Sequence, residues 1–367
     1  MVINPEFWQH KKVFITGHTG FKGGWLSLWL QLLGAEVYGY SLSPPTLPNF
    51  YETARVANLL SGHTLGNVLD GATLGKAIKS IQPDVVFHLA AQPLVRYSYK
   101  APVETYAVNV LGTANLLEAV RSTPSIRAVV NITTDKCYEN REWCYPYREN
   151  DPLGGHDPYS ASKACAEIVT KSYRASFFTA SLDASQPLAA IATARAGNVI
   201  GGGDWAEARL IPDCIQSLIQ KKPIYLRYPG AIRPWQHVLE PLAGYLILAQ
   251  KLWLQSSSLY ADSWNFGPDP ASEETVEKIA QQVIQLWGSG ELKVDRANIH
   301  PHEAGLLRLD TTKAKTYLGW RSRLSLPEAL KQTVDWYRAW QNGEDMQQYS
   351  LAQIRAYQDR GAVFKDE

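Results

Sequence analysis

Tyr159 and Lys163 stand four residues apart, so on a helix their side chains share one face. A tyrosine with an ordinary pKa of about 10 is a poor base at neutral pH. A neighbouring ammonium group stabilises the phenolate and lowers that pKa. The spacing therefore predicts a phenol that exchanges protons with a substrate hydroxyl, beside a lysine that can also hold the ribose of a nicotinamide cofactor.

A second candidate group, Thr134, Asp135 and Lys136, follows the short apolar run Ala128–Ile132. In parallel sheets, ligands bind outside the carboxyl ends of the strands. The threonine hydroxyl could hydrogen-bond a substrate oxygen, and the next two side chains could transfer protons. Lys136 is a base only if its pKa falls towards neutrality, which an adjacent carboxylate opposes; otherwise it stays charged and stabilises an enolate. The alternative is an exposed Asp-Lys pair in a loop.

A third group is a glycine-rich turn after Val13–Ile15, with the spacing GxxGxxG. Glycines at this spacing let a backbone approach a pyrophosphate, which then lies on a helix N-terminus. The turn predicts a dinucleotide site; a simple tight turn is the alternative. The residues assigned to it are Gly17, Thr19, Gly20, Phe21, Lys22 and Gly23, and His18 is expected to contact backbone or phosphate.

The adenosine end of this site lacks its usual acidic residue. A carboxylate about 20 residues after the turn normally binds the ribose hydroxyls. Here the second strand ends at Tyr40-Ser41-Leu42, so Ser41 is the nearest polar candidate, and Asp70 is placed to meet the adenine. The choice between NAD and NADP stays open on these residues.

The elements that must position these groups alternate between strand and helix. Short, fully apolar strands between helices predict a doubly wound α/β fold, a Rossmann-type parallel sheet covered on both faces. The expected strands are Val13–Ile15, Glu36–Tyr40, Asp84–Leu89 and Ala128–Ile132, and the expected helices are Trp25–Leu33, Val103–Val120 and Glu167–Phe178.

After about residue 196 the pattern becomes irregular and rich in Pro and Gly. We expect residues 1–196 and 235–262 to form the NAD-binding domain. Residues 197–234 and 263–367 are expected to form a smaller C-terminal domain that binds the substrate. The active site is then expected between the two.

Together, the glycine turn, His88–Gln92, Thr134 and the Tyr159/Lys163 pair resemble the extended short-chain dehydrogenase/reductase superfamily, and Asn109 matches its structural asparagine. Within it, Thr134-Asp135-Lys136 resembles the triplet of sugar-nucleotide 4,6-dehydratases. A lysine in third place is similar to the members that act on CDP-glucose. The segments 154–158, 195–205 and 233–237 fit the same subfamily.

This resemblance implies NAD as cofactor, with Leu89, Ala90 and Ala91 beside it. It also implies a redox-neutral reaction: oxidation at C4, loss of water across C5 and C6, and hydride return to C6. Asp135 would be the acid towards the C6 oxygen, and Lys136 stands where other members keep a glutamate base. The product would be a 4-dehydro-6-deoxy sugar nucleotide for deoxysugar and surface-polysaccharide (O-antigen) synthesis, made by a homodimer or homotetramer.

A nucleotide diphosphate needs donors for two phosphates. Arg233 is the first choice because a guanidinium fork suits phosphate oxygens, and Arg308 is the second; a surface ion pair is the alternative for each. Asn198 resembles the asparagine that meets the diphosphate in related enzymes. The remaining candidates on the substrate side are Gln92, Arg96 and Arg209.

Bulk properties narrow the partners. A net charge of +1 over 367 residues gives no field that favours nucleic acid or an anionic membrane. The first ten residues lack the pattern of a signal peptide, and no apolar run reaches the roughly 18 residues of a membrane span. The four cysteines have no disulfide or zinc spacing, which favours a cytoplasmic protein. Despite His300, His302 and Glu303, no metal site is expected.

Two other functions fit parts of the pattern. A nucleotide-sugar 4-epimerase shares the tyrosine-assisted oxidation but not the loss of water, and the Asp135-Lys136 pair argues against it. A non-catalytic dinucleotide sensor could use the same fold, yet it would not need Thr134, Tyr159 and Lys163 together.

Overall fold

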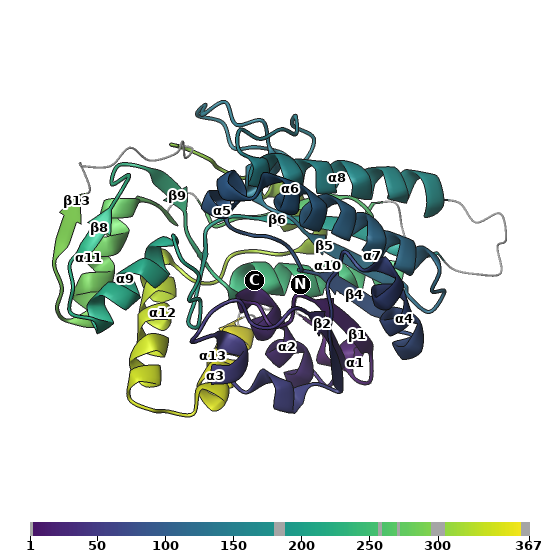
Figure 1. Ribbon diagram of the computed structural model, residues 1–367, viewed down its shortest axis with the longest axis horizontal. Helices are drawn as coiled ribbons and strands as arrows, with labels where there is room; N and C mark the ends of the chain where they lie inside the picture. Colours follow the sequence, from purple (N-terminus) through teal and green to yellow (C-terminus); the bar gives the residue numbers. More distant parts are fainter. Residues whose placement is uncertain (1–2, 180–187, 256–258, 270–271, 295–304, 361–367) are drawn as a thin grey trace.

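The computed structural model describes residues 3–179, 188–255, 259–269, 272–294 and 305–360. Its centre is a seven-stranded sheet in the order β11-β6-β5-β4-β1-β2-β3, in which every pairing is parallel (Figure 1). The strands are β1 (Lys12–Thr16), β2 (Glu36–Ser41), β3 (Gly62–Leu65), β4 (Val85–His88), β5 (Ala128–Ile132), β6 (Ala190–Ala196) and β11 (Ser263–Phe266). The predicted doubly wound α/β class is confirmed.

Both faces of the sheet are covered, which is why its central strands are continuously apolar. In β1, Val13 and Ile15 belong to the larger hydrophobic core, whereas Phe14 between them belongs to a second core on the opposite face. The larger core contains side chains of α2 (Phe21–Leu32) and α10 (Leu239–Gln255). The second contains side chains of α4 (Gly71–Ile81) and α7 (Gly112–Arg121), and partly buried side chains of α8 (Pro158–Phe177) pack against it.

The predicted helix Val103–Val120 is divided. It consists of α6 (Pro102–Tyr106), a π-helical turn at Ala107–Leu111, and α7. The π turn contains Asn109, whose side chain accepts a hydrogen bond from the Gln92 backbone N–H (2.9 Å) and donates to the Ser162 hydroxyl (2.9 Å). This asparagine therefore joins the loop after β4 to α8, and π turns are frequent at functional sites.

The smaller part lies at the left of Figure 1. It pairs β8 with β13 and β9 with β12, and beside it β7 pairs with β10. Its elements and their neighbours are β7 (Val199–Ile200), α9 (Leu210–Ile219), β8 (Ile224–Leu226), β9 (Ile232–Pro234), β10 (Gln236–His237), β12 (Glu273–Thr275), α11 (Val276–Trp287), β13 (Leu292–Val294), α12 (Leu326–Gln341) and α13 (Met346–Arg360). Short helices occur at α1 (Pro5–Trp8), α3 (Phe50–Thr53) and α5 (Val95–Lys100).

The chain returns to the sheet after residue 235, through α10 and then β11, which pairs with β6. The residue boundaries of the two parts stay a prediction. Within the described ranges, no helix combines the length and the apolar character that crossing a membrane requires.

Candidate active site

A cavity of about 2050 Å³ opens at the carboxyl ends of β1, β2, β4 and β5. Here β1 lies between β2 and β4, and the strand order continues outward from β1 in both directions. This position is the topological switch point of the sheet. Its other wall comes from α9, β8 and β9 of the smaller part. Single-ligand pockets measure roughly 300–1,000 Å³, so this cavity has room for a dinucleotide and a second nucleotide together.

The glycine turn forms one end of the cavity. Gly17 has φ +80°, and a Cβ there would lie 2.7 Å from the backbone nitrogen of Ala90. A Cβ on Gly23 would lie 2.1 Å from the carbonyl oxygen of Gly17. Among the described residues, no side chain caps the N-terminus of α2 at Gly20, which leaves its first N–H groups available to an anion. The turn therefore fits a pyrophosphate.

Two hydroxyl groups lie at the end of β2, where a dinucleotide site usually has a carboxylate. Thr19 and Ser41 lie 2.7 Å apart, oxygen to oxygen, and Thr19 also donates to the Leu42 carbonyl (2.9 Å). All three residues line the cavity. The adenosine end thus offers neutral hydroxyl groups to a ribose.

The structure places Asp70 away from this end. Its carboxylate caps α4 by accepting from the Thr73 backbone N–H (3.0 Å) and hydroxyl (2.6 Å). Gly66, Asn67 and Val68 line the cavity, and Asp70 does not. His18 is buried, with its ring where a Cβ on Gly39 would be (2.4 Å), so it packs under the turn.

Tyr159 and Lys163 come from the first two turns of α8, and both line the cavity. The helix begins with Asp157 as its cap, whose side chain accepts from the Ser160 backbone N–H (2.9 Å), and with Pro158 in its first turn. The Lys163 ammonium donates to the carbonyl oxygen of Ile132 at the end of β5 (3.1 Å).

Burial dominates the electrostatics of this pair. It raises the pKa of Tyr159 to about 12, against a hydrogen bond with Thr134 that lowers the pKa. Burial also lowers the pKa of Lys163 to about 8. Against the expectation of a lowered pKa, the pKa of Tyr159 is raised overall, because burial outweighs the hydrogen bond with Thr134 and the positive charge of Arg209.

Thr134, Asp135 and Lys136 also line the cavity, in a short 3₁₀ turn at Asp135–Cys137 that follows β5. The Thr134 hydroxyl accepts from the Lys136 backbone N–H (3.3 Å) and donates to the Asp135 carboxylate (3.0 Å). We call residues 134–137 the catalytic turn. The structure thus brings the five predicted catalytic residues and the glycine turn to one cavity.

Four of the substrate-side candidates line the same cavity: Arg96, Asn198, Arg209 and Arg233. Arg233 is 7% exposed and donates to the carbonyl oxygens of Ile232 (2.9 Å) and Gly305 (3.1 Å). Arg209 forms an ion pair with Asp204 (2.8 Å), which also lines the cavity.

The structure places Gln92 and Arg308 outside the lining. The Gln92 side chain donates to the Thr105 hydroxyl (2.8 Å) and accepts from the Leu94 N–H (2.6 Å), so it holds the loop after β4. Arg308 forms an ion pair with Glu273 (2.6 Å) and is only partly buried. Its expected alternative, an ion pair, is the arrangement observed.

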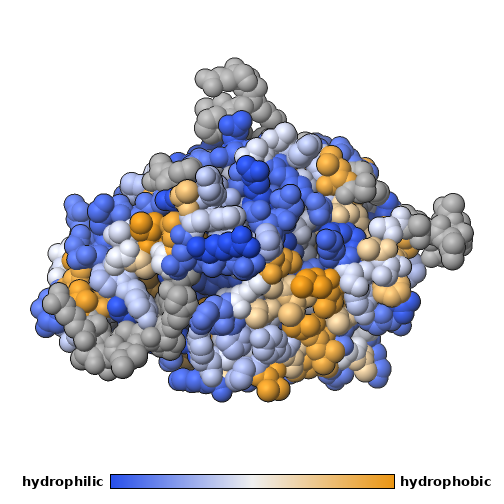
Figure 2. Space-filling model, turned by 90° about the horizontal axis from the view of Figure 1, so that it is seen from above, coloured by the Kyte–Doolittle hydropathy of each residue, from blue (hydrophilic) through white to orange (hydrophobic). Residues whose placement is uncertain are grey.

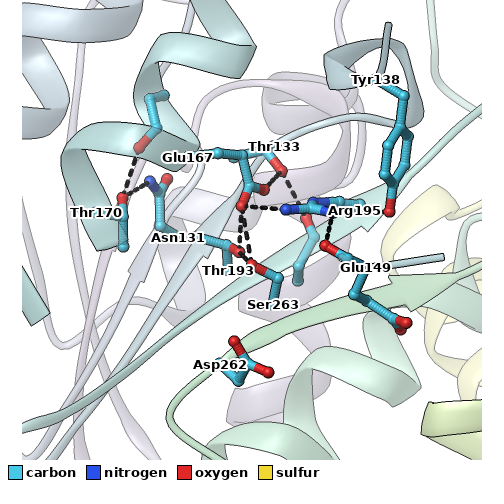
Figure 3. Close-up of polar contacts among 12 residues, drawn as sticks. Asn131, Thr133, Tyr138, Glu149, Glu167, Thr170, Thr193, Arg195, Asp262 and Ser263 are labelled. Carbon is cyan, nitrogen blue, oxygen red and sulfur yellow. Dashed lines mark hydrogen bonds and ion pairs between the residues drawn. The ribbon is translucent and has the colours of Figure 1, made fainter. Parts of the chain in front are cut away.

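Sequence reasoning missed a buried ion pair behind the catalytic turn. Glu167 on α8 and Arg195 on β6 lie 2.8 Å apart, and each side chain is 2% exposed (Figure 3). Although burial works against it, Arg195 holds the pKa of Glu167 below its usual value. The available signal was spacing, because Glu167 follows Lys163 by four residues on the same helix face.

In the part of the chain with described positions, no group of His, Cys, Asp or Glu side chains is arranged to hold a metal ion. His300, His302 and Glu303 lie outside that part. The four cysteines are free thiols.

The chain is similar in sequence to known sugar-nucleotide 4,6-dehydratases. Residues 14–333 match the family model described as GDP-mannose 4,6 dehydratase. The chain is 50% identical, over 97% of its length and 98% of the relative's, to CDP-glucose 4,6-dehydratase of Salmonella typhimurium. It is 26% identical to dTDP-glucose 4,6-dehydratase of Haemophilus influenzae over 70% of this chain and 76% of that one.

Solved structures share the fold. The dTDP-glucose 4,6-dehydratase of Bacillus anthracis in complex with NAD matches with a TM-score of 0.73 and 22% identity, covering 91% of this chain and 98% of that one. The epimerase Mth375 of Methanothermobacter thermautotrophicus matches with a TM-score of 0.76 and 22% identity, covering 93% and 96%.

Proposed function

The chain belongs to the GDP-mannose 4,6-dehydratase family, and on that premise we propose that it is an NAD-dependent hydro-lyase that converts CDP-glucose to CDP-4-dehydro-6-deoxy-glucose and water. The choice of CDP-glucose follows the relative that is 50% identical over nearly the whole chain. One structural observation carries the proposal: Thr134, Asp135, Lys136, Tyr159 and Lys163 line a single cavity with the glycine turn.

The glycine turn is suited to hold the pyrophosphate of NAD, and the hydroxyls of Thr19 and Ser41 are suited to its adenosine ribose. Leu89, Ala90 and Ala91 line the cavity after β4, beside the turn. NAD held there would supply the hydride chemistry of the reaction, removal of a hydride from C4 of the sugar and its return to C6.

In the oxidation, Tyr159 acts as a phenolate that takes the proton of the C4 hydroxyl and becomes a phenol, and the Thr134 hydroxyl orients the same oxygen. Burial raises the pKa of Tyr159, so formation of the phenolate depends on the groups that lower this pKa, the hydrogen bond with Thr134 and the positive charge of Arg209. Lys163, held by the Ile132 carbonyl, is positioned for a ribose hydroxyl and keeps a positive charge near the phenol.

In the elimination, the ketone at C4 acidifies the proton at C5. The Asp135 carboxyl group donates a proton to the C6 oxygen, which leaves as water while the C5–H bond electrons form the C5–C6 double bond. Lys136 is either the base that takes the C5 proton or the cation that stabilises the enolate while a water molecule takes that proton. Hydride addition at C6 and proton return at C5 then complete the 6-deoxy product.

The cavity walls of the smaller part supply cationic groups for a diphosphate. Arg209 lies at the start of α9 and Arg233 lies on β9, and Arg96 on α5 and Asn198 line the same cavity. Guanidinium groups bind phosphate oxygens through paired hydrogen bonds, so these residues suit the two phosphates of CDP.

The assembly is proposed to be a homodimer. Apolar side chains on and beside α6 and α8 are exposed, with Val103 at 81%, Leu111 at 52% and Ile168 at 55%. Figure 2 shows hydrophobic residues gathered on the right half of the upper face, where these helices lie in Figure 1. Covering them is the physical reason for pairing. A cytoplasmic location and a role in O-antigen deoxysugar synthesis complete the proposal.

The deciding experiment incubates the protein and NAD+ with CDP-, UDP-, dTDP- and GDP-linked hexoses and determines product masses. Loss of one water from CDP-glucose is expected. A product of unchanged mass would instead indicate a 4-epimerase, and no product from any sugar nucleotide would favour a non-catalytic sensor. Light scattering of the same sample measures the oligomeric state.

A further inference from the structure

We propose that the buried Glu167–Arg195 ion pair is a positioning device, which holds both ends of the catalytic turn so that Asp135 and Lys136 meet the sugar during elimination. The inference rests on the proposed function, because it assigns these two side chains to the loss of water. It assigns no contact with substrate to Glu167 or Arg195.

The first end of the turn is held by Glu167. Its carboxylate accepts a hydrogen bond from the hydroxyl of Thr133, the residue before the turn (2.5 Å). Its other oxygen accepts from Thr193 (2.6 Å) and from Ser263 (3.2 Å), so the carboxylate is fixed from β6 and β11 as well (Figure 3).

The second end is held by Arg195. The guanidinium donates to the hydroxyl of Tyr138, the residue after the turn (2.7 Å), and to the carbonyl oxygen of Glu149 (3.0 Å). It also lies 4.9 Å from the centre of the Tyr138 ring. The Tyr138 hydroxyl donates in turn to Asn265 on β11 (2.7 Å). One ion pair therefore ties Thr133 and Tyr138, five residues apart, to the sheet.

The network is costly as a source of stability. Removing two charges from water is expensive, and well-packed apolar residues often stabilise a core equally well. A fully satisfied polar network instead fixes one geometry. Burial lowers the pKa of the Lys163 ammonium, and Glu167, one helical turn away, works in the opposite direction. Arg195 neutralises Glu167, so the turn is held without leaving an unbalanced charge behind the lysine.

A matched control exists in the same place. Asn131 donates to the hydroxyl of Thr170 (2.9 Å), and this bond joins β5 to α8 one turn further along the helix. Thr133 and Thr170 are both buried. Thr170→Val removes a hydrogen bond between β5 and α8, and Thr133→Val removes one between the residue after β5 and α8, but only Thr133→Val releases the catalytic turn.

The test compares Thr133→Val and Tyr138→Phe with Thr170→Val and the wild type, all loaded with NAD+ and mixed rapidly with CDP-glucose. These variants avoid Glu167→Gln, which would leave Arg195 buried and unpaired and could prevent folding. Absorbance of the reduced nicotinamide reports sugar oxidation, product mass reports water loss, and urea unfolding reports stability.

In Thr133→Val and Tyr138→Phe, we expect water loss slowed by roughly tenfold to a hundredfold, as for displaced catalytic groups, and oxidation slowed less, because Thr134 alone of the turn takes part in it. The reduced nicotinamide signal then persists. Thr170→Val should be destabilised to a similar extent but keep wild-type time courses. Equal slowing of both steps in all three variants would overturn the inference. A wild type that oxidises and dehydrates nothing would instead defeat the proposed function, and the inference with it.

Discussion

The carboxylate of Asp135 lies directly against the backbone of Gly197. A Cβ on residue 197 would lie 1.7 Å from its Oδ2 atom, far inside any contact distance. The end of β6 and the catalytic turn therefore meet at a position that only glycine can occupy without displacing the proposed acid.

Gly197→Ala should displace Asp135 and lower kcat by roughly a hundredfold, the cost of a catalytic group misplaced by about 1 Å. NAD+ affinity should not change, because the glycine turn is elsewhere in the cavity. Gly230→Ala is the control, since a Cβ there meets nothing within 4 Å. Steady-state kinetics and cofactor titration check both. Wild-type kcat in Gly197→Ala would mean that Asp135 is not the acid.

Tyr159→Phe should lower kcat by roughly 10²- to 10⁴-fold, the range for loss of a general acid–base group. The ring keeps its packing, so CDP-glucose binding, measured by calorimetry, should stay close to that of the wild type. Retention of wild-type kcat would show that another group takes the C4 proton.

Substitutions of Arg233 and Arg308 should differ in their effect on the KM for CDP-glucose. Arg233→Ala should raise the KM for CDP-glucose by about tenfold, equivalent to about 1.4 kcal/mol, because a cavity-lining guanidinium is lost. Arg308→Ala should leave KM within about twofold, since its ion pair with Glu273 is partly exposed and such pairs contribute little. Equal increases in KM would show that Arg233 acts only through the local fold.

Stability should decrease in acid because three histidines are buried. Burial lowers the pKa of His18 to about 4, and of His88 and His237 to about 3. The unfolded chain binds protons below about pH 6.5, whereas the folded chain does not. This stability is therefore present above pH 6.5 and is lost as the pH falls towards the folded values, by about 2 kcal/mol per histidine near pH 5.

Urea unfolding at neutral and acidic pH measures this loss. In His237→Phe, the loss of folding stability in acid should be smaller by the contribution of one histidine. His10→Asn, at an exposed position, should not alter this loss. An unchanged pH dependence in His237→Phe would show that protonation of His237 does not contribute to the loss of stability in acid.

Two glycines inside helices should respond oppositely to alanine. A Cβ on Gly75 in α4 meets nothing within 4 Å, so Gly75→Ala should stabilise the protein by about 0.5–1 kcal/mol through helix propensity. A Cβ on Gly244 in α10 would lie 2.3 Å from the Phe266 ring, and Gly244→Ala should cost about 1–3 kcal/mol. Melting temperatures of the two variants give the comparison.

The sequence predicted what depends on local pattern. The strand at Ala128–Ile132 appears with the expected ends, because a fully apolar run between turn signals fits a buried parallel strand. The convergence of the catalytic turn with Tyr159 and Lys163 was predictable for another reason: their helix follows the same strand after one loop, and ligands bind at the carboxyl ends of parallel strands.

What could not be predicted depends on contacts between distant segments. The Glu167–Arg195 pair joins residues 28 positions apart in the sequence, and the packing of α8 against β6 brings them together. Whether Arg308 meets Glu273 or a phosphate depends on where β12 lies. Asp70 was predicted to meet the adenine, and in the structure it caps α4. In the sequence, a carboxylate just before a helix fits both roles.

Helix α8 carries Tyr159, Lys163 and Glu167 at intervals of one turn, and its cap at Asp157 lies just before them. Each residue advances a helix by about 100°, so a single insertion after Pro158 would rotate the phenol, the ammonium and the carboxylate away from their partners together. The sheet, the glycine turn and the arginines would keep their places. Tyr159 lies two residues after the cap at Asp157. This spacing sets the rotation of α8 about its own axis, and with it the positions of all three side chains relative to the rest of the site.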